Sequence, residues 1–149
     1  MSDEITPAQH RRLAVTCNNS TWEVMDAERT PANDEEMLRR AYAAAYHWQR
    51  AEGTGPQNEA RAVWLLSRAH RLAGHPELAL HYADACITVC GEHDIADFDL
   101  AYGHEARARA LASLGRDGEA AAAWAAAKAV PVADPEDRAV LEADLAEGP

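Results

Sequence analysis

The sequence has few of the residues that strands and turns depend on. Phenylalanine occurs once, glycine eight times and proline seven times in 149 residues, while alanine occurs 34 times. Strands favour aromatic and β-branched residues, whereas alanine is the strongest helix former. The composition therefore predicts an all-α protein. The length suits one domain, which we place at residues 1–149.

Cysteines and long apolar runs are also scarce. The three cysteines are Cys17, Cys86 and Cys90. An odd number in a chain of this size does not indicate a disulfide framework and suits a reducing compartment. The acidic start of the chain lacks the pattern of a signal peptide, and no apolar run is long enough for a membrane span. Thirteen arginines against one lysine are typical of a GC-rich genome. We therefore expect a cytoplasmic, bacterial protein.

Basic residues are in the minority, because 14 Lys and Arg stand against 25 Asp and Glu, for a formal net charge of −11. A net anion is not attracted to a phosphate backbone or to acidic lipids. The charge therefore argues against nucleic acid and membrane partners. It does not exclude a local basic patch that binds a small or extended anionic ligand.

Prolines, glycines and capping residues divide the chain into helix-sized segments. Asn33 or Asp34 is expected to cap the second segment, Gly74 to end the third in the left-handed conformation, and Asp97 and Asp134 to cap the fifth and seventh. The predicted helices span about 7–27, 34–51, 58–73, 76–90, 97–114, 117–129 and 135–145.

Two of these helix pairs share a pattern of small residues at a separation of 41. Ser67 precedes Ala79 by twelve residues, as Ala108 precedes Ala120, and a further small residue follows seven later in each copy. Small side chains at the crossing point of two antiparallel helices let their axes approach closely. The pattern therefore predicts two similar helix hairpins.

At these positions the sequence resembles the tetratricopeptide repeat (TPR) family. The family pattern of a small residue, a helix-ending glycine, an alanine and an aromatic is matched in the second copy by Ala108, Gly115, Ala120 and Trp124. The first copy matches it through Ser67, Gly74 and Ala79. The resemblance covers about residues 58–130. It implies an antiparallel array of about three helix pairs with a C-terminal capping helix.

The match to the family pattern is incomplete. Val63 and His104 stand at its usual aromatic entry position, and His70 replaces another aromatic. The period of 41 exceeds the family's 34, and residues 7–52 match only as a helix pair of suitable length. A generic helix array in which the alanines serve packing alone is the alternative.

The resemblance also implies where a ligand would bind, because the first helix of each pair lines the concave face. That interaction face would bind a protein or peptide segment, or a small anionic ligand. Arginine binds carboxylates and phosphates in a bidentate manner, and tryptophan offers stacking or cation–π contact. The family's carboxylate-clamping lysines and asparagines are not reproduced. The expected ligand-binding residues are Arg61, Trp64, Arg68, Arg71, Tyr102, Glu105 and Arg109.

The alternative for this set is purely structural, with arginines that pair with nearby acids and with Trp64 in the core. Spacing alone places Arg61, Trp64, Arg68 and Arg71 on one stripe of a helix, which fits both interpretations.

Histidines and acids offer a different hypothesis, in which the protein is a metal- or small-molecule-binding helical protein and possibly an enzyme. Helical bundles can assemble a metal site from one residue per helix. The candidate ligands lie on four predicted helices, at His47, His70, His81 and His104. Because no metal-binding motif is present, hydrogen-bonded packing histidines are the simpler expectation, and we predict no cofactor.

Other chemical motifs are weak. Cys86, Cys90 and His93 share a metal-like spacing, but Cys86 is at a packing position of the repeat. His93-Asp94 is only a two-residue match to metal-dependent phosphohydrolases. No nucleophile elbow or phosphate-binding loop is present, so catalysis has no support in the sequence. Helical arrays often pair an exposed end helix with a second copy, which makes a homodimer a further expectation.

Overall fold

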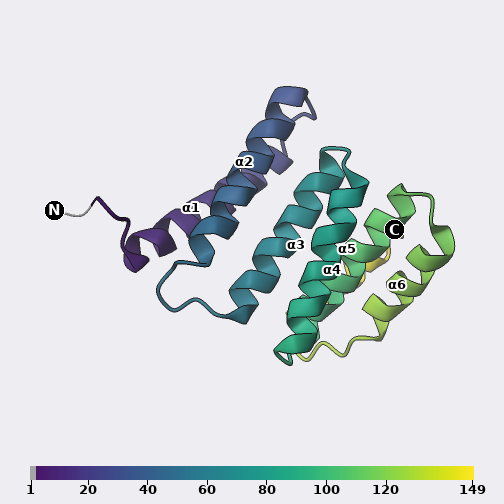
Figure 1. Ribbon diagram of the computed structural model, residues 1–149. Helices are drawn as coiled ribbons and strands as arrows, with labels where there is room; N and C mark the ends of the chain where they lie inside the picture. The colour runs from purple at the N-terminus through teal and green to yellow at the C-terminus, as the bar shows by residue number, and fades with distance from the viewer. Residues whose placement is uncertain (1–2) are drawn as a thin grey trace.

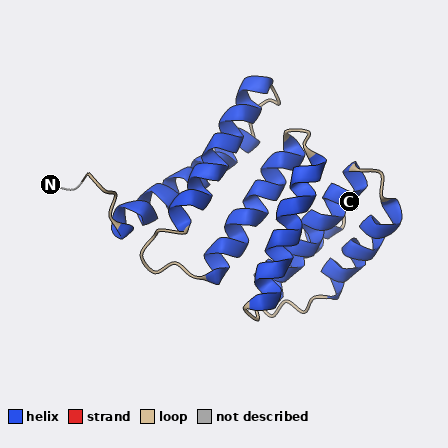
Figure 2. Cartoon of the chain, in the orientation of Figure 1, coloured by secondary structure: helices blue, strands red, loops and turns tan. Residues whose placement is uncertain are grey.

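The computed structural model describes residues 3–149, and within them it contains seven α-helices and no strand (Figure 2). The all-α prediction is therefore confirmed. The helices are α1 (Pro7–Met25), α2 (Pro31–Trp48), α3 (Pro56–Leu72), α4 (Pro76–Glu92), α5 (Asp97–Ser113), α6 (Asp117–Ala129) and α7 (Pro135–Leu145).

Threonine–proline pairs begin the first two helices. The Thr6 side chain accepts a hydrogen bond from the Gln9 backbone in α1, and Thr30 does the same for Asn33 in α2. A proline at the first helical position is favourable because its missing N–H needs no partner there. The predicted cap of α2 at Asn33 or Asp34 is thus wrong, since both residues lie inside the helix.

The other helix ends agree more closely with the sequence. Gly74 and Gly115 follow α3 and α5 with φ of +81° and +74°, the left-handed conformation that glycine adopts without strain. The Asp134 side chain caps α7 by accepting two backbone hydrogen bonds. Asp97, in contrast, is the first residue of α5 rather than its cap.

Consecutive helices pack against one another along the whole array (Figure 1). The hairpins are α1–α2, α3–α4 and α5–α6, and α5 also contacts α3. The chain thus forms the expected array of antiparallel hairpins, in which the first helices of successive pairs become neighbours.

The small residues shared by the α3–α4 and α5–α6 hairpins are buried between the paired helices. Ala79, Ala108 and Ala120 are buried, and the Ser67 hydroxyl donates a 2.7 Å hydrogen bond to the Ala79 carbonyl oxygen. This bond ties α3 to α4, whereas α5 and α6 rely on apolar contact alone.

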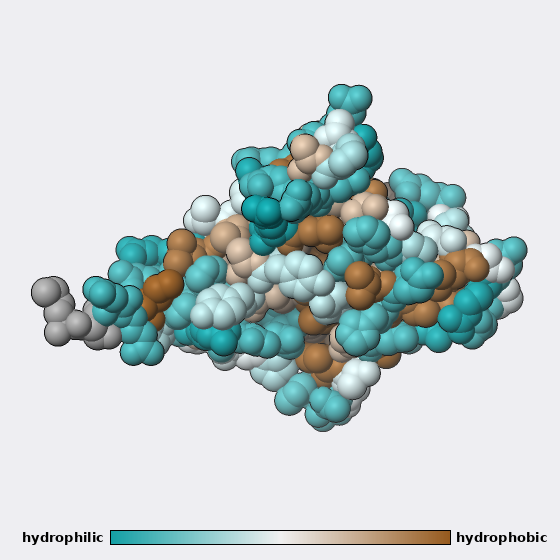
Figure 3. Space-filling view, turned by 45° about the horizontal axis from the view of Figure 1, so that its top comes forward, coloured by the Kyte–Doolittle hydropathy of each residue, from teal (hydrophilic) through white to brown (hydrophobic). Residues whose placement is uncertain are grey.

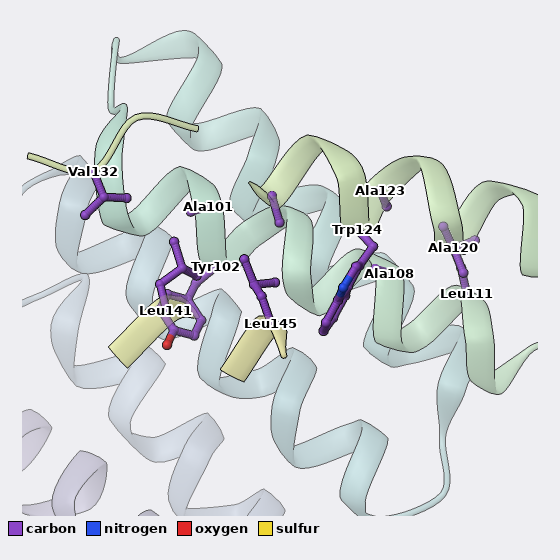
Figure 4. Close-up of a cluster of buried hydrophobic side chains, with 11 residues drawn as sticks. Ala101, Tyr102, Ala108, Leu111, Ala120, Ala123, Trp124, Val132, Leu141 and Leu145 are labelled. Carbon is purple, nitrogen blue, oxygen red and sulfur yellow. The ribbon is translucent and has the colours of Figure 1, made fainter. Parts of the chain in front are cut away.

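The last helix, α7, covers the end of the array. Its Leu141 and Leu145 pack into a buried cluster with Tyr102 of α5 and Trp124 of α6 (Figure 4). This cluster closes the apolar end of the array, the role expected of a capping helix.

The outer surface is mixed in character. On the face drawn in Figure 3, hydrophobic residues form patches among hydrophilic ones. Within residues 3–149, none of the helices combines the length and apolarity that a membrane crossing requires.

Candidate functional site

The first helix of each pair and the last helix enclose a groove of about 500 Å³. Its wall includes residues of α1, α3, α5 and α7, with Cys86 of α4 at its base. A volume of this size is within the range of small-molecule and side-chain sites. The aromatic and charged residues of its wall are Trp22, Arg61, Trp64, Arg68, Phe98, Asp99, Tyr102 and Asp144.

Four aromatic rings form a continuous apolar surface in this groove. The indole centroids of Trp22 and Trp64 lie 5.8 Å apart, and the Trp64 ring meets the Tyr102 ring edge-on at 5.7 Å. Phe98 follows at 4.7 Å from Tyr102. Such contacts hold the rings rigidly and present apolar area to a ligand.

Arg68 is the unpaired cation of the groove. Its guanidinium carbon lies 5.3 Å from the Trp22 ring centroid and 5.7 Å from that of Trp64, within cation–π range. No other residue in the range 3–149 accepts a hydrogen bond from Arg68 or forms an ion pair with it. Its positive charge therefore has aromatic neighbours but no counter-ion.

Two buried hydrogen-bond donors in this wall lack an acceptor. They are Nε of Arg68 and Nε1 of Trp64, and within the described part of the chain only Arg29 shares this property. Buried polar atoms without a partner are rare because they cost free energy. Both atoms are closed to solvent, whereas the two terminal nitrogens of Arg68 are not among the buried atoms and remain open to a ligand.

Arg61 and Asp99 satisfy each other at the edge of the groove. Arg61 Nε donates to Asp99 Oδ1 at 2.9 Å, and Gln57 donates to Asp99 Oδ2 at 2.8 Å. Arg61 therefore contributes little free charge, although it lies on the predicted stripe.

Tyr102 and Asp144 form a second polar contact across the groove. The Tyr102 hydroxyl donates to Asp144 Oδ2, which links α5 to α7. Burial raises the pKa of Tyr102 well above its usual value, and the hydrogen bond and charge of Asp144 raise it further. Tyr102 is therefore neutral and acts here as a donor.

The remaining predicted residues line a smaller recess beside the groove. Glu105 is buried and accepts a hydrogen bond from Arg109, which also reaches Glu147 at 3.3 Å. The Arg109 guanidinium lies 5.3 Å from the Trp124 ring centroid. For Glu105 and Arg109 the geometry thus supports the structural alternative, because they bind each other rather than face the groove.

Arg71 lies in the same recess, without a hydrogen bond or ion pair to any described residue. Burial lowers its pKa, and the positive charges of Arg109 and Arg68 lower it further. Arg68 and Arg71 thus place two positive charges without ion-pair partners among the described residues close to each other.

Trp22, Phe98 and Asp144 of the wall were not predicted from the sequence as candidate functional residues. They are on α1, α5 and α7. The wall partners of Trp22 and Asp144, which are Trp64 and Tyr102, are 42 residues away in the chain, whereas Phe98 contacts Tyr102 on its own helix. The sequence identified Trp22 only as an apolar residue of the first helix. Nothing in the sequence distinguished Asp144, because an acidic residue on an exposed capping helix is ordinary.

The four candidate metal-ligating histidines do not converge. His47 Nδ1 lies 2.8 Å from His10 Nδ1, while His70 contacts the Tyr42 hydroxyl at 2.9 Å and His75 Nδ1 at 3.2 Å. Burial lowers the pKa of His47, His70 and His104. The fourth, His81, is exposed beside the Tyr82 ring. Among residues 3–149, no three His, Cys, Asp or Glu side chains are placed to hold a metal ion.

The other reactive groups are engaged or enclosed. Cys86 and Cys90 are buried, and burial raises the pKa of both thiols. The Ser67 and Ser113 hydroxyls donate to backbone carbonyls. These side chains are thus explained by packing, whereas the groove around Arg68 is not.

Comparison of the chain with protein-family models, curated proteins and solved structures gives no match.

Proposed function

We propose that this protein is a non-enzymatic, cytoplasmic interaction module of the tetratricopeptide type, and that its groove binds a carboxylate attached to an apolar group. The carboxylate would belong to a peptide segment or to a small organic acid. The observation that carries this proposal is the Arg68 guanidinium, which lies beside two indole rings without a counter-ion.

The repeat assignment is supported by particular residues. Two hairpins end their first helix at a left-handed glycine and cross at small residues such as Ser67 and Ala108. In addition, the groove is lined by the first helix of each pair, which is the face that the resemblance to the family implies.

A carboxylate suits the site for a physical reason. Arginine presents parallel N–H donors that match two carboxylate oxygens, and such charge-assisted hydrogen bonds are stronger than neutral ones. The Arg68 side chain is partly buried beside the indoles, and partial removal from water strengthens the attraction of a charge for an anion. The apolar part of the ligand would contact Trp22, Phe98 and Tyr102.

Isothermal titration calorimetry with two probes tests the proposal. The probes are 3-phenylpropionate, for a small acid, and N-acetyl-L-phenylalanine, for a peptide carboxyl end. We expect Arg68→Met to weaken binding of whichever probe binds by about tenfold or more, because a charge-assisted hydrogen bond is lost while the apolar stem remains. N-acetyl-L-phenylalanine amide, which lacks the carboxylate, should bind no better to the wild-type protein than to the variant.

Arg39→Ala is the matched control, since it removes one positive charge from an exposed pair on α2. It should leave affinity unchanged, and circular dichroism should show equal helicity in all three proteins. Equal binding by Arg68→Met and wild type would refute the proposal, and so would the absence of binding at millimolar concentration by these probes and by L-phenylalanine alike. Self-association remains a separate prediction, which light scattering at micromolar concentration tests.

A further inference from the structure

We infer that the occupant of the groove is a small apolar zwitterion, a free amino acid or a dipeptide, with its carboxylate at Arg68 and its ammonium group at Asp144. This inference rests on the proposed function and specifies its ligand class. It follows from how the four charged residues of the wall are paired.

Two of these four charges neutralise each other. Arg61 and Asp99 are joined by a 2.9 Å ion pair, and Gln57 occupies the second oxygen of Asp99. Neither side chain needs a ligand to complete its hydrogen bonding.

The other two charges, Arg68 and Asp144, have no ion-pair partner among the residues that the structure describes. They do not pair with each other, so the groove presents one free cation and one free anion. Arg109 approaches Asp144, but it does so at the backbone carbonyl at 3.4 Å, and its ion pairs are with Glu105 and Glu147.

Asp144 retains an acceptor for a ligand. Its Oδ2 accepts the Tyr102 hydroxyl, whereas no described residue donates to Oδ1. Because this oxygen is not among the buried atoms without a partner, it is open to solvent. It can therefore accept a hydrogen bond from an ammonium group.

The opposed charges discriminate between ligand classes. A phosphate or a dicarboxylate would be attracted by Arg68 but repelled by Asp144, since like charges in a partly enclosed site are unfavourable. A zwitterion is attracted at both ends, by Arg68 at its carboxylate and by Asp144 at its ammonium group. The aromatic surface between them favours an apolar side chain, and the volume of about 500 Å³ suits an amino acid or a dipeptide.

Calorimetry with two matched pairs of probes tests this inference. The first pair is L-phenylalanine and 3-phenylpropionate, which lacks the amine. The second pair is L-alanyl-L-phenylalanine and its N-acetyl form. In at least one pair we expect the zwitterion to bind about tenfold or more tightly than the amine-free probe. The pair that shows this difference identifies whether the ligand is a free amino acid or a dipeptide.

Asp144→Asn should remove that difference without weakening the amine-free probe, because asparagine still accepts the Tyr102 hydroxyl but carries no charge. Glu142→Gln, at an exposed residue of the same helix, is the matched control and should preserve the difference. Circular dichroism should show that both variants are folded.

The possible failures are distinguishable. If the amine-free probes bind as tightly as the zwitterions, or if Asp144→Asn weakens all probes equally, the zwitterion is refuted and the carboxylate site stands. If none of the four probes binds, both proposals fail.

Discussion

Truncation of Arg109 tests whether the recess beside the groove is structural. The Glu105 side chain is 3% exposed and the Arg109 side chain 15%, so Arg109→Ala would leave a carboxylate buried without its partner. Breaking a buried pair in this way costs about 3–5 kcal/mol. Because Arg71 lies close enough to interact with Glu105, we take the lower end, about 3 kcal/mol, as the expected loss.

The assay is urea denaturation followed by circular dichroism at 222 nm, with a parallel thermal melt. For a domain of this size, about 3 kcal/mol corresponds to a fall in melting temperature of about 6–12 °C. Arg39→Ala is the control, because both side chains of its ion pair are about two-thirds exposed or more. Its expected cost is about 0.5 kcal/mol or less.

A double variant separates the ion pair from other effects. Glu105→Gln combined with Arg109→Met removes both charges, and it should be less destabilised than Arg109→Ala alone because no buried charge is left unpaired. If Arg109→Ala costs about 1 kcal/mol or less, the assignment of this pair to stability is refuted and a ligand role for Arg109 becomes the better explanation.

Three further predictions concern stability. Burial in the folded state lowers the pKa of His70, so folding favours the neutral imidazole. The contribution of neutral His70 to stability should be complete above the ordinary pKa of about 6.5. It should be lost as the pH falls through and below that value. His70→Phe should therefore reduce the fall in melting temperature between pH 7.5 and pH 5.5. Ser67→Ala should cost about 1 kcal/mol in urea denaturation, since it deletes the hydrogen bond to Ala79, and a neutral result would contradict that role. Gly74→Ala should cost about 1 kcal/mol, because φ is +81° there; Gly118→Ala, where φ is not positive, is the control and should not destabilise.

Much of the fold was predictable because its signals are local. Proline and glycine positions divided the chain correctly into seven helices, and the separation of 41 between Ser67 and Ala108 indicated the hairpins. Two caps were misplaced. The cap of α5 is Ala96 rather than Asp97, an error of one residue, and for α2 Thr30, Asn33 and Asp34 are all good capping residues, so only the chain path decides which one precedes the first turn.

The candidate site was predictable only in part. The stripe of Arg61, Trp64, Arg68 and Arg71 was visible because it belongs to one helix. Sequence spacing allows the pair of Glu105 and Arg109, which are four residues apart on one helix. It could not show that Arg61 pairs with Asp99 on another helix while Arg68 has no such partner.

The sequence by itself determined the helical class, the hairpin pairing and the positive stripe, because helix propensity, capping and small-residue spacing act over a few residues. Only the tertiary structure decided that Arg61 and Arg109 are engaged in ion pairs while Arg68 is free. It also brought Trp22, Phe98 and Asp144 into the same wall. The physical reason is that ion pairing and enclosure depend on distances between helices, which are set by how the hairpins pack and not by any single segment.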